Sequence, residues 1–190
     1  MTYSSIQNQT TDTFLDKSKK FGLRPGIFIG VVIMIYLVVG LFVVNQYGES
    51  IDEPPRMAYA ELSSRAYSGG SVDLPDEKGP FYGMIALQSA KILVHLIPNW
   101  KIIDGWNYMS FVAFVMGVFF FYRLCRRMFN PVPSIAATLL FSTQPIIWGH
   151  AFINPKDIPF MAFFWPVYAW VWRWSTTGRP RRNPPVSHLQ

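Results

Sequence analysis

Two short polar stretches carry the residues with the clearest chemical potential. In the first, Asp52-Glu53-Pro54-Pro55-Arg56, two adjacent carboxylates precede two prolines and a cation. A carboxylate can orient or deprotonate a hydroxyl group, and arginine can bind phosphate oxygens through paired hydrogen bonds. The same residues also suit the start of a helix, with Asp52 as the cap and Pro54 in the first turn. A catalytic role and a purely structural role therefore both stay open.

The second stretch, Asn154-Pro155-Lys156-Asp157, lies between two apolar segments. Polar groups at such a boundary are commonly no more than interfacial residues. We single them out because the topology derived below places them on the same face as the first stretch. His95 shares a helical face with Gln88 and Lys91, but no histidine or cysteine stands near it at the spacing of a metal site. We therefore predict no cofactor, and leave the need for a divalent metal open.

The elements that must position these residues are apolar helices. Of the 190 residues, 51% are apolar and only 15% are charged, whereas soluble domains carry about 25% charged residues. Four segments qualify as membrane spans: 27–44, 105–122, 131–148 and 158–172. A helix needs roughly 20 residues to cross a core ~30 Å thick, and flanking residues complete each segment. We expect an all-α polytopic membrane protein with about four transmembrane helices.

The distribution of charge orients these spans. Residues 1–26, 123–130 and the tail from 173 hold 11 Lys/Arg and two acidic residues, whereas 45–104 and 149–157 hold six and nine. Because cytoplasmic loops are enriched in Lys and Arg, we expect both termini in the cytoplasm and both acidic loops outside the cell membrane. The net charge of +6 is clustered between apolar runs, which favours a bilayer surface and not a nucleic acid as partner.

Three regions follow from this topology. They are a cytoplasmic segment at 1–26, a transmembrane domain at 27–174 and a basic, proline-rich cytoplasmic tail at 175–190. Within the long outer loop, 56–67 and 81–97 have the pattern of amphipathic helices that lie at the membrane interface or pack along the spans. No motif for nucleotide binding is present in the sequence.

A first span followed at once by Asp52-Glu53, then an amphipathic loop, then Asn154-Pro155-Lys156-Asp157-Ile158-Pro159-Phe160, resembles the membrane glycosyltransferases of GT-C type. The nearest branch contains the protein O-mannosyltransferases and the aminoarabinose transferases of lipid A. The resemblance implies transfer of a sugar from a polyprenyl-phosphate carrier to a protein, lipid or glycan acceptor, as in protein glycosylation. It also implies catalytic carboxylates at Asp52, with Glu53 beside it, and at Asp157. Because the family's enzymes are longer, we expect this chain to be an N-terminal portion that is inactive alone.

The implied reaction assigns a role to each candidate residue. The acceptor hydroxyl attacks the anomeric carbon with inversion, the lipid phosphate leaves, and Asp52 acts as the base. The substrate-binding candidates, chosen by charge and position, are Arg56, Lys78, Asn154 and Lys156. Two alternatives remain: a non-catalytic small membrane protein or inactive truncated paralogue, and a transporter or flippase fragment. The uncharged spans disfavour transport.

Overall fold

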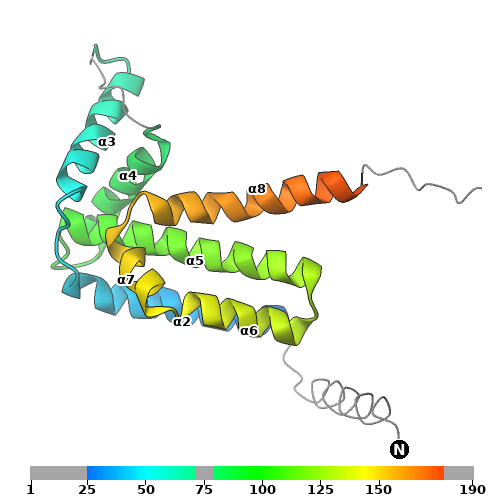
Figure 1. Ribbon diagram of the computed structural model, residues 1–190. Coiled ribbons are helices and arrows are strands. Elements are labelled where there is room, and N and C mark those ends of the chain that lie inside the picture. The colour runs from blue at the N-terminus through cyan, green and yellow to red at the C-terminus, as the bar shows by residue number, and fades with distance from the viewer. Residues whose placement is uncertain (1–24, 72–78, 178–190) are drawn as a thin grey trace, which may run out of the picture.

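The computed structural model describes residues 25–71 and 79–177, and within these ranges the chain forms helices and no strand (Figure 1). Lys78 and the terminal segments at 1–24 and 178–190 lie outside the described residues. The elements in chain order are α2 (Pro25–Val43), η1 (Val44–Gln46), α3 (Glu53–Tyr67), α4 (Phe81–Leu96), α5 (Ile102–Met128), α6 (Pro131–Ser142), α7 (Pro145–Ile153) and α8 (Asp157–Thr177).

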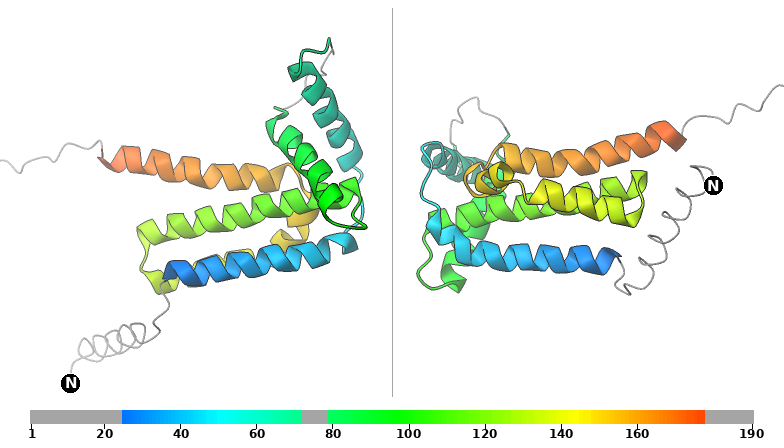
Figure 2. Two further views of the ribbon diagram at one scale, coloured as in Figure 1. Left: turned by 180° about the vertical axis from the view of Figure 1, so that it is seen from behind. Right: turned by 60° about the horizontal axis from the view of Figure 1, so that its bottom comes forward.

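The 27-residue helix α5 is the centre of the fold, and it packs against α2, α4, α6, α7 and α8. Figures 1 and 2 show α2, α6 and α8 running alongside α5, while α3 and α4 lie across one end of this bundle. At that end an aromatic core joins three elements, since the ring of Phe152 stacks on Phe111 and on Tyr47, with 4.3 Å between the centroids of each pair. The end of the bundle that carries the predicted polar loops is therefore well packed.

Small residues allow α5 to approach its neighbours closely. A Cβ atom placed on Gly105 would lie 2.9 Å from the Cα of Ala90 in α4. One placed on Gly117 would lie 3.4 Å from the Cα of Ala162 in α8. Close backbone approach of this kind is typical of helices that associate through van der Waals packing, including helices in membranes.

Two helices of the described residues are long and apolar enough to cross a membrane, by length and composition alone: Pro25–Gln46 and Ile102–Met128. They correspond to the first two predicted spans. Helix α8 matches the fourth predicted segment and has 21 residues; it contains Pro166 and begins at a charged residue, Asp157.

The third predicted span, 131–148, is wrong as a single helix. Helix α6 ends at Ser142, and α7 begins at Pro145 and continues through residues 149–153, which we had predicted to be loop. Proline has no N–H to donate to the preceding turn, and it forces the residue before it into an extended conformation. Gln144 accordingly has a ψ of 121°. The polar residues of α6 do face inward as expected: Ser134, Thr138 and Ser142 are fully buried.

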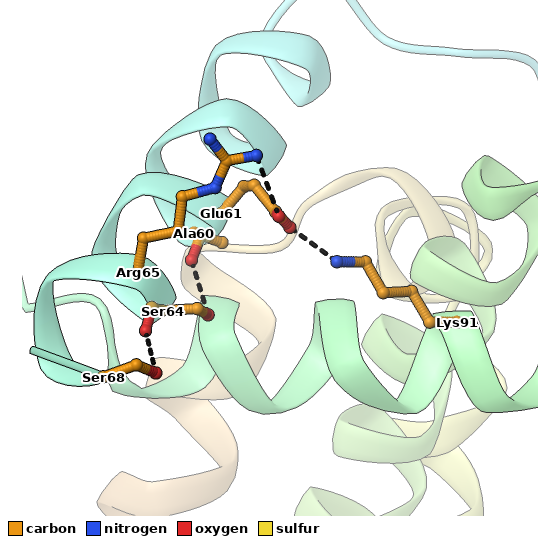
Figure 3. A network of polar contacts seen from close by, with 6 residues as sticks. All are labelled: Ala60, Glu61, Ser64, Arg65, Ser68 and Lys91. Atoms are coloured by element: carbon orange, nitrogen blue, oxygen red, sulfur yellow. Dashed lines mark hydrogen bonds and ion pairs between the residues drawn. The ribbon is translucent and has the colours of Figure 1, made fainter. Parts of the chain in front are cut away.

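The two amphipathic helices predicted in the first loop are confirmed. Helix α3 starts three residues earlier than predicted, at Glu53, and α4 ends one residue earlier, at Leu96. A polar network joins them (Figure 3), because the Glu61 carboxylate of α3 accepts a 2.6 Å hydrogen bond from Lys91 of α4 and lies 3.5 Å from Arg65. The two helices form one hairpin across the end of the bundle.

Candidate functional site

A cavity of about 630 Å³ opens where the α3–α4 hairpin meets the start of α8. Helix α3, the residues that begin α4, one residue of α5 and the α7–α8 connection with the first turns of α8 form its walls. The residues that line it are Arg56, Tyr59, Ala60, Gly79, Pro80, Phe81, Tyr82, Gly83, Trp106, Pro155, Lys156, Pro159, Phe160 and Phe163.

The charged groups of this cavity are hydrogen-bond donors. Arg56 comes from α3 and Lys156 from the α7–α8 connection, and no carboxylate is among the described residues that line the cavity. The Nε1 of Trp106 and the hydroxyl of Tyr82 are buried; the indole N–H has no hydrogen-bond partner among the described residues, and the Ser110 hydroxyl lies beside that of Tyr82. Both atoms are enclosed by protein, so the groups that face the open part of the cavity are the two cations.

The Tyr82 hydroxyl stays protonated at neutral pH. Burial raises the pKa of Tyr82 to about 12, and the nearby Ser110 hydroxyl offsets only part of this rise. Tyr82 is therefore neutral, and Arg56 and Lys156 are the charged groups of the cavity. These two cations favour an anionic ligand.

Three phenylalanine side chains in the walls of the cavity are partly exposed to solvent. Phe81, Phe160 and Phe163 line the cavity and keep 69%, 71% and 45% of their surface exposed. Exposed apolar rings beside two cations suit an amphiphilic ligand, whose polar head enters while its apolar part stays at the rim.

Glu53 is fully buried and joins three parts of the fold. Its Oε2 accepts a 2.7 Å hydrogen bond from the backbone N–H of Ser50. The surrounding acceptors assign the amide nitrogen of Asn107 to the side that faces Glu53. Asn107 Nδ2 then donates to Glu53 Oε1 at 2.9 Å and to the carbonyl oxygen of Phe152 at 3.3 Å. Burial raises the pKa of Glu53 above its ordinary value, as does Glu49, although the Ser50 N–H opposes this rise.

Asp52 is exposed, in contrast to its neighbour. It occupies the N-cap position of α3, but its side chain makes no capping hydrogen bond, so the predicted capping role is wrong. The Glu53 side chain bonds the Ser50 N–H just before the helix instead. Asp52 is not among the residues that line the cavity.

The Asn154-to-Asp157 stretch forms the start of α8. Asn154 Oδ1 accepts hydrogen bonds from the backbone N–H groups of Asp157, at 3.0 Å, and of Lys156, at 3.3 Å. Asn154 Nδ2 donates to the Asp157 carboxylate at 3.0 Å. This arrangement satisfies backbone donors that a helix start leaves unpaired. It also turns the chain so that Lys156 reaches the cavity.

The structure thus brings together two of the seven predicted site residues, Arg56 and Lys156, at one cavity. It places Asp52, Glu53, Asn154 and Asp157 next to that cavity in sequence but not among its lining residues. Sequence reasoning missed Tyr82, Trp106 and Asn107. An asparagine near the outer end of an otherwise apolar segment was the available signal, because polar groups in such segments are usually paired.

Comparison with known proteins assigns the chain to no family. No protein-family model matches the chain, and neither the curated proteins nor the solved structures contain a significant match. Within the described residues, no group of three or more His, Cys, Asp and Glu side chains is placed to hold a metal ion.

Proposed function

We propose that this chain forms the lipid-phosphate sugar site of a membrane glycosyltransferase, at the extracytoplasmic end of a helix bundle. The observation that carries the proposal is the cavity at the α3–α4 hairpin, which two cations, Arg56 and Lys156, line together with exposed aromatic rings and without a carboxylate among the described lining residues. A polyprenyl-phosphate sugar matches this cavity because its phosphate and hydroxyl oxygens accept hydrogen bonds while its tail remains in lipid.

The described acidic residues lie at one end of the bundle, whereas the described Lys and Arg residues lie at both ends. Every described acidic residue lies between 49 and 104 or at 157, and therefore at the end that carries α3, α4 and the α7–α8 connection. Arg123, Arg126 and Arg127 lie near the C-terminal end of α5, and Arg173 lies near that of α8, at the opposite end. In the proposed four-span arrangement, α2, α5, the α6–α7 pair and α8 cross the bilayer of the cell membrane.

The proposed chemistry uses one residue outside the cavity. The acceptor oxygen bonds to the anomeric carbon as the bond from that carbon to phosphate oxygen breaks, and the phosphate leaves with the electron pair. Asp52 takes the hydroxyl proton. Its exposure at the start of α3, four residues before Arg56, leaves its carboxylate accessible to an acceptor that approaches from the aqueous side. Arg56 and Lys156 stabilise the charge on the departing phosphate.

A binding experiment with the full chain tests the donor site without requiring turnover. The protein, in lipid nanodiscs, is titrated with farnesyl phosphate, and farnesol serves as the uncharged control. We expect saturable binding of the phosphate only, weakened about tenfold by Arg56→Ala or Lys156→Ala, because each change removes a charge-assisted hydrogen bond.

The matched control is Arg65→Ala, which removes the same charge from the same helix but outside the cavity. It should leave the affinity within twofold. If farnesol binds as tightly as farnesyl phosphate, or if Arg65→Ala weakens binding as much as Arg56→Ala, the proposed donor site is wrong.

A second candidate is a non-catalytic membrane protein, or an inactive truncated paralogue of such an enzyme. One observation favours it: the hydrogen bonds of Asn154 and Asp157 account for that stretch as a helix start, with no need for a substrate. In that case, replacing Arg56 or Lys156 by alanine should not change the affinity for farnesyl phosphate.

A further inference from the structure

Helix α3 has few attachments to the rest of the molecule. It packs mainly against α4, where Ala60 lies in a small buried cluster with Trp106 and neighbouring residues of α4. Its N-terminal turn is attached through Glu53, which bonds Asn107 of α5, and Asn107 in turn bonds the last turns of α7 at Phe152. Glu53 is therefore the polar link from the first turn of α3 to the centre of the bundle, and the apolar packing of Met57 and Ala60 against Trp106 begins in the next turn.

We infer that Glu53 is a positioning residue, which fixes the N-terminal turn of α3 and thereby aims Arg56 into the cavity. Residues three apart in a helix lie on neighbouring positions of the same face, so the rotation of the helix that buries Glu53 also sets the direction of Arg56. The inference rests on the proposed function for the identity of the ligand. The hydrogen bond between Asn107 and Glu53, which we call the clamp, lies within the protein and does not depend on any ligand.

The position of Glu53 separates this role from a catalytic one. The side chain has no exposed surface, and it is not among the residues that line the cavity. Both carboxylate oxygens already accept hydrogen bonds from Ser50 and Asn107. Glu53 thus acts on a ligand through the orientation of α3, whereas Asp52 presents its carboxylate to solvent.

Affinity for farnesyl phosphate in nanodiscs tests the link to Arg56. Glu53→Ala should weaken binding about tenfold, because a buried donor loses its acceptor and α3 is released. Glu53→Gln keeps an acceptor for Ser50 and should stay within threefold of the wild type. In an Arg56→Ala background, Glu53→Ala should change the affinity less than twofold, since the residue through which it acts is gone.

Glu61→Ala is the matched control. It removes a carboxylate from the same helix, but one in a partly exposed ion pair with Lys91, so binding should change less than twofold. The inference is overturned if Glu53→Gln loses as much affinity as Glu53→Ala, which would show that the charge itself contacts the ligand. It is also overturned if Glu53→Ala retains its full effect without Arg56.

Hydrogen exchange of the ligand-free protein distinguishes failure of this inference from failure of the proposed function. Glu53→Ala and Asn107→Ala should both speed exchange of the backbone amides at 56–60 at least tenfold and leave those of α8 unchanged. If the wild type binds no farnesyl phosphate, the proposed function fails, and this exchange result still decides whether the clamp holds α3. Unchanged exchange at 56–60 overturns it.

Discussion

Asp52 and Glu53 are adjacent in the chain, yet the structure gives them opposite environments. Asp52 is exposed at the start of α3, and Glu53 is enclosed between the N–H of Ser50 and the amide of Asn107. The start of a helix turns successive side chains by about 100°, so one of two neighbours can face the bundle while the other faces water. The acidic pair is thus two residues with separate roles, one suited to meet an acceptor and one suited to hold the helix.

The buried carboxylate predicts a pH dependence of stability. Burial raises the pKa of folded Glu53 above its ordinary value of 4.5. As the pH rises from 4.5 to the raised pKa of folded Glu53, the unfolded chain releases its proton first, so the unfolded state is favoured. The penalty is absent below pH 4.5 and complete above the raised pKa of the folded state. Glu53→Gln has no such penalty, so its melting temperature relative to wild type should increase from pH 4 to pH 8.

The measurement is thermal unfolding of both proteins in the same detergent across that range. Glu61→Gln is the comparison, because the hydrogen bond from Lys91 lowers the pKa of Glu61, and the stability this gives is complete above pH 4.5. The melting temperature of Glu61→Gln relative to wild type should therefore not increase from pH 4 to pH 8. Parallel curves for Glu53→Gln and wild type would show that Glu53 is not buried as described.

Only part of the site could be predicted from sequence at the level of residues. Arg56 and Lys156 were selected by sign and position alone, and they do line one cavity. Tyr82 and Trp106 were not selected, because an aromatic residue in an apolar helix is ordinarily core. Their place in the cavity wall depends on how α4 packs on α5, and that is a property of the fold and not of residue type.

At the scale of elements, the start of α8 depends on one side chain. Asn154 Oδ1 accepts from two backbone N–H groups, those of Lys156 and Asp157. Asn154→Ala should therefore lower the free energy of unfolding by about 1 kcal/mol, within the usual range of 0.5–2 for a lost cap. Denaturant titration in detergent micelles checks this value. Asn154→Ser, which retains an acceptor oxygen without adding a charge beside Asp157, should lose less; an equal loss would contradict the capping role.

The contact between α4 and α5 predicts a second stability change. Gly105→Ala places a methyl group 2.9 Å from the Cα of Ala90, and a backbone atom cannot move aside as a flexible side chain can. We expect a loss of about 1–3 kcal/mol, the usual cost of overpacking. Gly30→Ala is the control, since nothing lies within 4 Å of the added Cβ. It should be neutral or stabilising, because alanine favours helix over glycine by about 1 kcal/mol.

Thermal unfolding of the two variants side by side provides the measurement. If Gly105→Ala has the same melting temperature as the wild type, α4 does not pack on α5 at this distance, and the wall of the cavity at Tyr82 is misplaced. The control separates this result from a general effect of alanine on helix stability.

Helices that are marked by a simple hydropathy pattern could be predicted from the sequence, whereas a helix boundary that is set by a single proline could not. Uncharged runs located α2 and α5, and amphipathic spacing located α3 and α4. The segment at 131–148 also satisfied the criterion of an apolar run, yet Pro145 divides it into α6 and α7. Hydropathy averages over such a break, because it does not register the missing N–H of proline or the extended residue before it.

At the scale of the whole molecule, the two ends of the bundle differ in charge. The described acidic residues gather where α3 and α4 cross the bundle, and arginines gather near the C-terminal ends of α5 and α8. The end with α3 and α4 also carries Arg56, Arg65, Lys91, Lys101 and Lys156, so the two ends differ in their carboxylates and not in a surplus of cations at the arginine end. The proposed orientation rests on the Lys and Arg count of the whole sequence.

Cysteine labelling tests this orientation. In a Cys125→Ser background, Ser71→Cys and Ser175→Cys place exposed thiols after α3 and near the end of α8. A membrane-impermeant thiol reagent added to intact cells should label position 71 and leave position 175 unlabelled until the membrane is permeabilised. Equal labelling of both positions in intact cells would contradict the topology.

The central claim is that the cavity between α3, α4 and α8 holds the headgroup of a lipid-phosphate sugar. Photo-crosslinking tests it most directly, with a polyprenyl-phosphate sugar that carries a photoreactive group on the sugar, followed by mass spectrometry of the labelled peptides. The account predicts label on residues 56–60, 79–83 and 155–163, lost on adding excess farnesyl phosphate and reduced about tenfold by Arg56→Ala but not by Arg65→Ala. Label spread over the exposed apolar face of α2 around Val31, Val38 and Phe42, and unaffected by competitor, would contradict it.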